Sequence, residues 1–205
     1  MIKLRDYQEE SISEIRTALS MYRSTLFQLT TGGGKTVIFS SIAKSSQKYG
    51  RKVLIISNRT EIMHQNGGAL SMIGLSVEYI SPKNREIPSG NVAVGMSQTI
   101  RRRVSVSEEW REYLKSIELL IVDEAHCCDH DFIYDYVSDD CFRLLVTATP
   151  RRQGNQKQLG SCAKSMVTGI KTKDLIRRGY LTPARHYSVA AQQLDDVEIN
   201  SGTKD

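Results

Sequence analysis

Six short, mostly apolar runs recur along the chain and are separated by longer, more polar segments. The runs occupy positions 26–29, 53–56, 77–80, 92–94, 119–122 and 144–146. Short continuous apolar runs are typical of parallel strands that are buried on both faces, and strands that alternate with helices indicate an α/β domain. The pattern therefore predicts a largely parallel sheet covered by helices.

Helix and turn signals organise the rest of the chain. Positions 81–91 are punctuated by proline and glycine and are expected to form a surface loop. Positions 171–179 predict a short helix with Thr172 as its N-cap. A final extended segment is expected at 183–190, and the polar stretch 192–205 is expected to be a linker or a frayed tail.

Composition indicates an ordinary globular protein with one domain. The chain has 205 residues, of which 40% are hydrophobic and 25% are charged. The net charge of +5 fits either a polyanionic partner or a solvated basic surface. No apolar run approaches membrane-spanning length and the N-terminus lacks a signal-peptide core. A soluble, cytoplasmic protein without a membrane partner is therefore expected, in the host cytoplasm if a phage encodes it.

The four cysteines show neither a C-x-x-C pair nor a regular disulfide framework, which favours reduced intracellular thiols. Cys127 and Cys128 lie between His126 and His130. Adjacent cysteines lack the usual spacing of zinc ligands, so a structural metal is disfavoured.

The glycine-rich stretch Thr31-Gly32-Gly33-Gly34-Lys35-Thr36 lies between the run 26–29 and a helical segment. Glycines at a helix start let backbone N–H groups surround a phosphate, and the helix adds the positive end of its dipole. Lys35 is placed to reach the β- and γ-phosphates of ATP, and the Thr36 hydroxyl to hold Mg²⁺. The strict pattern has glycine where this chain has Leu29. A plain glycine turn is the alternative, but it leaves the adjoining Lys-Thr unexplained.

A second candidate site follows the run 119–122, which ends in Asp123-Glu124-Ala125-His126. Ligands gather at the carboxyl ends of parallel strands. Asp123 is placed to anchor Mg²⁺, usually through water, and Glu124 to orient and deprotonate the water that attacks the γ-phosphate. Taken alone, the acidic pair could equally be the N-cap of a helix. Paired with the phosphate loop, it predicts metal-assisted phosphoryl transfer.

The order and spacing of these motifs resemble the first RecA-like lobe of superfamily 2 helicases with a DEAH box. The resemblance runs from Leu4 to about Val189. It implies a RecA-like P-loop NTPase fold, a three-layer α/β/α domain with a largely parallel sheet at residues 1–190. Residues 191–205 are then a polar tail at the start of the interdomain linker. Positions 176–183 are most similar to RadD-like enzymes and phage-encoded branched-DNA helicases. Thr30, where the family often has proline, and Leu29 depart from the family pattern without removing an essential group.

The resemblance implies roles for residues outside the two motifs. Arg5, Tyr7 and Gln8 stand where the family reads the adenine of ATP. His126 completes the catalytic set with Lys35, Asp123 and Glu124. Thr147 and Thr149 match the motif that couples nucleotide state to lobe movement, with hydroxyls that could bond the DEAH carboxylates and His126.

The resemblance also implies a nucleic-acid track. Asn58 and Arg59 follow one predicted strand, and Gln98 and Thr99 follow another, at the positions of the family's contacts to the sugar-phosphate backbone. Polar residues in strand-terminating loops are the alternative. The run 101–103 of three arginines could extend the track or be a solvated charge run.

A second RecA-like lobe is the partner that the resemblance implies. Helicases of this superfamily bind ATP between two such lobes, and the second brings arginines to the γ-phosphate. An arginine of this kind is worth about 10³–10⁵ in kcat. We therefore expect these 205 residues to bind nucleotide weakly and to hydrolyse it poorly by themselves, as a truncated product or a fragment of a longer protein.

The expected function is that of the ATP-binding lobe of an ATP-dependent DNA helicase or translocase that unwinds or remodels duplex or branched DNA. ATP and Mg²⁺ are the expected cofactors, and DNA is favoured over RNA. Two alternatives stay open: the motor of a restriction or RNA-remodelling system, and a nucleotide-dependent nucleic-acid-binding module without efficient turnover.

Overall fold

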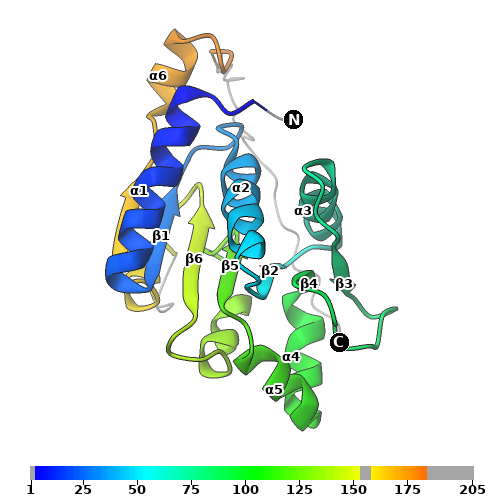
Figure 1. Ribbon diagram of the computed structural model, residues 1–205. Coiled ribbons are helices and arrows are strands. Elements are labelled where there is room, and N and C mark those ends of the chain that lie inside the picture. The colour runs from blue at the N-terminus through cyan, green and yellow to red at the C-terminus, as the bar shows by residue number, and fades with distance from the viewer. Residues whose placement is uncertain (1–2, 153–157, 184–205) are drawn as a thin grey trace, which may run out of the picture.

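A seven-stranded sheet forms the centre of the fold. The computed structural model describes residues 3–152 and 158–183. All neighbouring strands pair in parallel, in the order β3-β4-β2-β5-β6-β1-β7 (Figure 1). The strands are β1 (Ser24–Gln28), β2 (Val53–Ser57), β3 (Glu78–Ile80), β4 (Val92–Met96), β5 (Leu119–Asp123), β6 (Phe142–Thr147) and β7 (Ser165–Thr168).

Helices lie before, between and after the strands. They are α1 (Asp6–Tyr22), α2 (Lys35–Lys48), α3 (Thr60–Met72), α4 (Ser97–Val106), α5 (Glu108–Lys115) and α6 (Thr172–Arg177), with the 3₁₀ helices η1 (Cys128–Asp135) and η2 (Leu159–Ser161). Within 3–152 and 158–183, no helix has the length and apolar character needed to cross a membrane.

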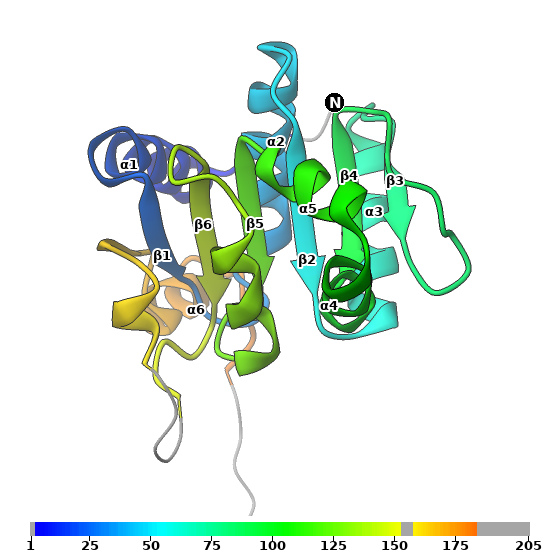
Figure 2. The ribbon, with the colours of Figure 1, turned by 90° about the horizontal axis from the view of Figure 1, so that it is seen from below.

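Alternate residues of each central strand enter two separate cores. In β2, Val53 and Ile55 pack in a cluster with α1, α2 and α3, whereas Leu54 and Ile56 pack in a cluster with α4, α5 and η1. Successive strand side chains point to opposite faces, so a strand covered on both faces must be apolar throughout. Figure 2 shows α4 and α5 in front of the sheet and α2 and α3 behind it. The domain therefore has the expected three α/β/α layers.

The structure confirms the six predicted strands and adds a seventh. The pattern does not indicate β7, because Val167 is its single buried residue and the strand lies at the edge of the sheet.

The helix predicted at 171–179 is α6, but Thr172 is wrong as its N-cap. Lys171 has the extended backbone of the N-cap, and Thr172 is already helical. The expected loop at 81–91 contains no helix or strand. The expected segment at 183–190 and the tail lie outside the described residues, apart from residue 183.

The parallel register brings the candidate residues to one edge of the sheet. Gln28 pairs with Thr147, and Asp123 pairs with Val146, so the carboxyl ends of β1, β6 and β5 lie side by side. The ends of β2 and β4 form the adjoining part of this edge, because β2 lies between β4 and β5. We call these two parts the β1/β6/β5 edge and the β2/β4 edge.

Candidate nucleotide site

The glycine-rich loop makes a tight turn between β1 and α2. Gly32 and Gly34 have φ angles of 77° and 87°, in the left-handed region that favours glycine. A Cβ atom added to Gly34 would lie 2.5 Å from Gln8 Nε2, so a side chain there would displace the N-terminal segment. Helix α2 begins at Lys35. The loop therefore stands at the positive end of a helix, where an anion is stabilised.

Leu29, the departure from the strict phosphate-loop pattern, lies beneath the loop. Its side chain is buried, and a Cβ atom added to Gly33 would lie 2.7 Å from Leu29 Cγ. Leucine thus fills the space that a glycine at position 33 leaves open. The Leu29 N–H donates to the Thr147 carbonyl over 3.1 Å, which fixes the loop to the end of β6. The larger side chain is therefore compatible with the phosphate-loop geometry.

Asp123 is a buried carboxylate that accepts two hydrogen bonds. Asn66 Nδ2, from α3, donates to Asp123 Oδ2 over 2.9 Å, and the Glu124 N–H donates to Asp123 Oδ1 over 3.0 Å. Burial raises the pKa of Asp123 above its ordinary value. The Asn66 hydrogen bond opposes this rise, the Glu124 charge adds to it, and the Lys35 charge again opposes it. Lys35 and Asp123 are thus close enough to interact electrostatically.

Glu124 turns the chain away from β5 in a conformation that is rare for a side-chain-bearing residue. Its φ angle is 51°, and such a left-handed residue costs roughly 1–2 kcal/mol. The Ala125 N–H holds the turn by donating to the Val146 carbonyl over 3.0 Å. Backbone strain of this kind clusters at functional sites.

His126 joins this turn to the end of β6. Its Nδ1 lies 3.0 Å from Thr147 Oγ1 and 3.3 Å from Glu124 Oε2. The Thr147 hydroxyl donates to the Thr149 carbonyl over 3.1 Å and accepts from the Thr149 N–H over 3.0 Å. The expected threonine contact with His126 is therefore present for Thr147, whereas Thr149 contributes its backbone.

The side chain of Arg152 holds the same turn in place. The residue is 3% exposed, and its guanidinium contacts both carboxylate oxygens of Asp131, at 2.7 and 2.8 Å. It also donates to the carbonyls of Ala125, over 2.9 Å, and His126, over 3.1 Å. A bidentate ion pair with two further charge-assisted hydrogen bonds fixes the backbone that follows Glu124.

The N-terminal candidates pack against the other side of the phosphate loop. The Tyr7 hydroxyl donates to the Gly33 carbonyl over 3.0 Å. Gln8 Oε1 accepts from the Arg5 N–H over 3.0 Å and so caps α1, which leaves the amide nitrogen facing the loop. The Arg5 guanidinium lies 4.2 Å from the centre of the Tyr180 ring. Tyr180, just after α6, thus adds an aromatic wall beside the adenine-reading candidates.

The nucleic-acid candidates lie on the β2/β4 edge. Asn58 and Arg59 follow β2 directly, and Gln98 and Thr99 belong to the first turn of α4. Asn58 Nδ2 donates to Cys127 Sγ over 3.1 Å. The Ser97 hydroxyl is hydrogen-bonded to His130 Nδ1 in η1. These two contacts connect the β2/β4 edge to the segment that follows Glu124.

Three residues of this site escape sequence reasoning. Asn66 carries the best signal, because it shares the buried face of α3 with Met63 and Leu70, where an unexplained polar residue stands out. Arg152 and Tyr180 carry no local signal, since each acts on residues far away in the sequence.

Comparison with known proteins identifies the family. The model of the family described as "Type III restriction enzyme, res subunit" matches residues 1–152. The candidate helicase 22 of Sulfolobus islandicus filamentous virus is 24% identical over 194 residues, which cover 90% of this chain and 35% of that protein. The ATP-dependent DNA helicase MPH1 of Candida albicans is 25% identical over 175 residues, which cover 72% of this chain and 13% of that protein.

The fold is also that of a solved helicase. The UvsW helicase from bacteriophage T4 superposes with a TM-score of 0.66 at 18% identity, over 82% of this chain and 60% of that one. The chain spans about a third of the length of the viral relative, 35%. Since the family model matches residues 1–152 of 205, the chain belongs to the Type III restriction enzyme res-subunit family.

Proposed function

We propose that this chain is the ATP-binding lobe of an ATP-dependent DNA helicase or translocase that unwinds or remodels duplex or branched DNA. The observation that carries the proposal is the placement of the phosphate loop and of Asp123 and Glu124 on one edge of the sheet, after the two strands β1 and β5 that flank β6. The family and its helicase relatives imply use of a nucleoside triphosphate. The name of the Candida relative supports ATP as that nucleotide and DNA as the nucleic acid.

The residues present fit a nucleotide with Mg²⁺. The loop residues Thr31 to Gly34 would surround the phosphates, and Lys35 would bind the β- and γ-phosphates. Thr36 and Asp123 supply a hydroxyl and a carboxylate, the hard oxygen ligands that Mg²⁺ prefers. Bound Mg²⁺ would neutralise charge that develops on the phosphates.

The remaining site residues would act on the attacking water and on the base. Glu124 would orient the water and accept its proton, and His126 would link Glu124 to Thr147 at the end of β6. Gln8 would offer its free amide nitrogen to the adenine edge, with Arg5 and Tyr7 beside it.

The β2/β4 edge would hold the sugar-phosphate backbone of a nucleic-acid strand. Asn58 and Arg59 would bind from the end of β2, and Gln98 and Thr99 from the first turn of α4. A second RecA-like lobe, in a longer chain, would close on the nucleotide and supply arginines to the γ-phosphate. Thr147 and Thr149 would transmit the nucleotide state to that closure.

Lys35→Ala tests the proposal. We expect loss of binding of a fluorescent ATP analogue by this chain, and a fall of about 10²-fold or more in DNA-stimulated hydrolysis by a protein that also carries the second lobe. Lys48→Ala is the matched control, because Lys48 is exposed at the opposite end of the same helix. Unchanged DNA-stimulated hydrolysis in Lys35→Ala would show the assignment to be wrong.

The family description supports a second candidate, the motor of a restriction enzyme. Competition between duplex DNA, branched DNA and RNA for stimulation of ATP hydrolysis separates the candidates. Preference for a branched junction supports a remodelling helicase, whereas equal stimulation by linear duplex DNA supports a restriction motor.

A further inference from the structure

A basic pocket lies between α4 and the loop that joins β3 to β4, away from the phosphate loop. Its volume is about 550 Å³. Its lining contains three arginines and no carboxylate: Pro82, Arg85, Thr99, Arg102, Arg103, Val106, Ser107 and Trp110. We call it the α4 pocket.

One face of α4 forms a wall of the pocket. Thr99, Arg102, Arg103 and Val106 follow at helical spacings of three and four residues, which places them on the same side of the helix. Thr99 is also one of the candidates for contact with nucleic acid. The α4 pocket therefore continues the β2/β4 edge along α4.

Arg103 holds the opposite wall in place. Its Nη2 donates to the Ser81 carbonyl over 2.7 Å and to the Asn84 carbonyl, and its guanidinium lies 4.6 Å from the centre of the Trp110 ring. The loop that carries Arg85 is thereby tied to α4. The pocket is thus built by specific contacts rather than by a chance gap in the surface.

The positive charge of the pocket is not neutralised. In the part of the chain that the structure describes, none of the three arginines forms an ion pair, and Arg103 Nη1 is buried without a hydrogen-bond partner. Burial lowers the pKa of Arg103, and the neighbouring Arg85 charge lowers it further. Like charges held together without a counter-ion favour binding of an anion.

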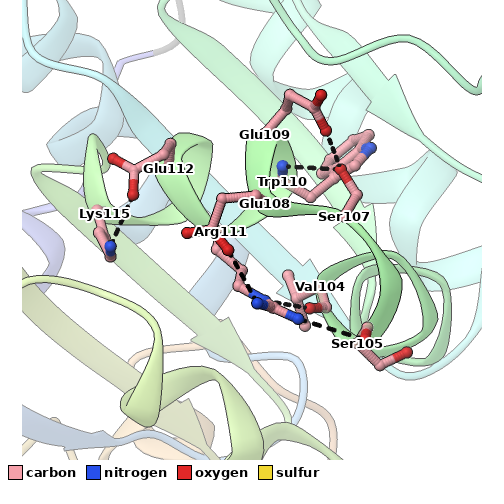
Figure 3. Close-up of polar contacts among 9 residues, drawn as sticks. All are labelled: Val104, Ser105, Ser107, Glu108, Glu109, Trp110, Arg111, Glu112 and Lys115. Carbon is pink, nitrogen blue, oxygen red and sulfur yellow. Dashed lines mark hydrogen bonds and ion pairs between the residues drawn. The ribbon is translucent and has the colours of Figure 1, made fainter.

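The three acidic residues of α5 are engaged in local contacts (Figure 3). Glu108 pairs with Arg111 at 2.9 Å, Glu109 accepts from the Ser107 hydroxyl over 2.6 Å, and Glu112 pairs with Lys115 at 2.7 Å. Arg111 also donates to the carbonyls of Val104 and Ser105 and so fixes the corner between α4 and α5. The carboxylates of this corner thus have partners within 105–115, and none of them forms an ion pair with an arginine of the pocket.

We propose that the α4 pocket binds the phosphodiester backbone of the nucleic acid beyond the first turn of α4. This inference rests on the proposed function, whose strand the pocket would extend. The step from Thr99 to Arg102 or Arg103 along the helix is about 4.5–6 Å, between one and two rises of 3.4 Å per nucleotide. Val106, 84% exposed, and Pro82 would contact sugars. Trp110 is 6% exposed and Arg103 covers one of its ring faces, so the ring offers no surface on which a base could stack, and the pocket would contact the backbone.

The double variant Arg85→Ala/Arg102→Ala of the 205-residue chain tests the proposal. The measurement is the anisotropy of a fluorescein-labelled 20-nucleotide single strand, without nucleotide, across a series of salt concentrations. Loss of two phosphate contacts should weaken binding and reduce the slope of log K against log salt by about 1.4. The affinity ratio of wild type to variant should therefore shrink by about sevenfold between 50 and 200 mM salt.

Three further arms make the result specific. Arg16→Ala/Lys48→Ala removes the same charge from exposed residues elsewhere on the surface and should keep most of the wild-type slope. Arg85→Lys/Arg102→Lys should restore most of the slope, since phosphate contact needs only the charge. Gln98→Ala measures how much the neighbouring β2/β4 edge contributes to binding of the strand. If Gln98→Ala weakens binding while Arg85→Ala/Arg102→Ala does not, the pocket proposal alone is overturned. If the wild-type chain binds no strand, the nucleic-acid part of the proposed function falls with it.

Discussion

Asn66 Nδ2 donates a hydrogen bond to Asp123 Oδ2 over 2.9 Å, between two residues that are 1% and 5% exposed. Asn66 belongs to the helix that follows β2, whereas Asp123 ends β5. The bond therefore spans the two parts of the sheet edge. A neutral amide orients the carboxylate without forming an ion pair with it, and its hydrogen bond opposes the rise in the Asp123 pKa that burial causes. The bond thus favours the charged form that a cation would need.

Asn66→Ala should weaken Mg²⁺ binding in the presence of nucleotide, because Asp123 loses the partner that fixes its orientation. Removing a residue that hydrogen-bonds to a metal ligand, without binding the metal itself, lowers metal affinity by about 10–100-fold. The measurement is the Mg²⁺ dependence of binding of a fluorescent ATP analogue. Asn91→Ala, an exposed amide in the loop before β4, is the control and should keep wild-type behaviour. An unchanged Mg²⁺ dependence in Asn66→Ala would rule out this positioning role.

Gly34→Ala should abolish nucleotide binding with only a modest loss of stability. The φ angle of 87° strains any side-chain-bearing residue, and the added Cβ would lie 2.5 Å from Gln8 Nε2. The free energy of unfolding should fall by about 1–2 kcal/mol. Gly68→Ala is the matched control, because Gly68 lies in α3 with open space around its Cα. That variant should gain about 0.5–1 kcal/mol from helix propensity and bind nucleotide normally. Analogue titration and urea unfolding check both; equal binding by the two variants contradicts the prediction.

His130 should make the protein acid-sensitive. Burial lowers its pKa to about 4, with Arg152 and His126 adding to the fall and Asp129 and Asp131 opposing it. An unfolded histidine titrates near 6.5. Above that pH both states are neutral. As pH falls from about 6.5 to about 4, His130 becomes protonated in the unfolded state but not in the folded state. The free energy of unfolding therefore falls by about 3 kcal/mol in all.

Urea unfolding at pH 7.5, 6 and 5 measures this window. His130→Gln should lose most of the slope between pH 6.5 and 5. His64→Gln, which changes an exposed histidine of α3, should keep it. Identical slopes in wild type and His130→Gln would show that other groups cause the acid sensitivity.

The central strands could be predicted because their burial is uniform. Residues 119–122 are apolar and buried on both faces, so the run shows the strand directly. β7 could not be predicted, because an edge strand with exposed Met166 and polar neighbours has no such pattern. The hydroxyl of Thr172 predicts the N-cap of α6 one residue too late, because Lys171 takes that position without a side-chain hydrogen bond.

Some residues of the candidate site could be predicted from the sequence and others could not. Lys35 and Asp123 follow strand ends, so their convergence on one edge follows from a parallel sheet. Arg152 and Tyr180 reach the site through contacts with residues 21 or more positions away, such as the Asp131 ion pair and the Arg5 stacking. Such contacts depend on tertiary packing and leave no spacing in the sequence.

Two further hydrogen bonds span the two edges and predict coupling between the ligands. Ser97, which precedes Gln98, is bonded to His130, and Cys127 accepts from Asn58. Cys127 and His130 both follow the turn at Glu124, so a shift of that turn on nucleotide binding would move the ends of β2 and β4. Ser97→Ala and Cys127→Ala should therefore weaken the effect of DNA on nucleotide affinity by about 0.5–2 kcal/mol while each ligand still binds alone.

The coupling is measured as the ratio of nucleotide dissociation constants with and without a saturating single strand. Linkage requires the same ratio for DNA with and without nucleotide, which provides an internal check. Ser105→Ala is the control, because among residues 3–152 and 158–183 that hydroxyl bonds only the Arg102 carbonyl within its own helix. Cys127→Ala is informative because it removes the acceptor and leaves Asn58 free to bind the strand. If both variants keep the full coupling ratio, the nucleotide state reaches the β2/β4 edge through the Asn66–Asp123 bond instead. Adding Asn66→Ala to either variant would then abolish the coupling.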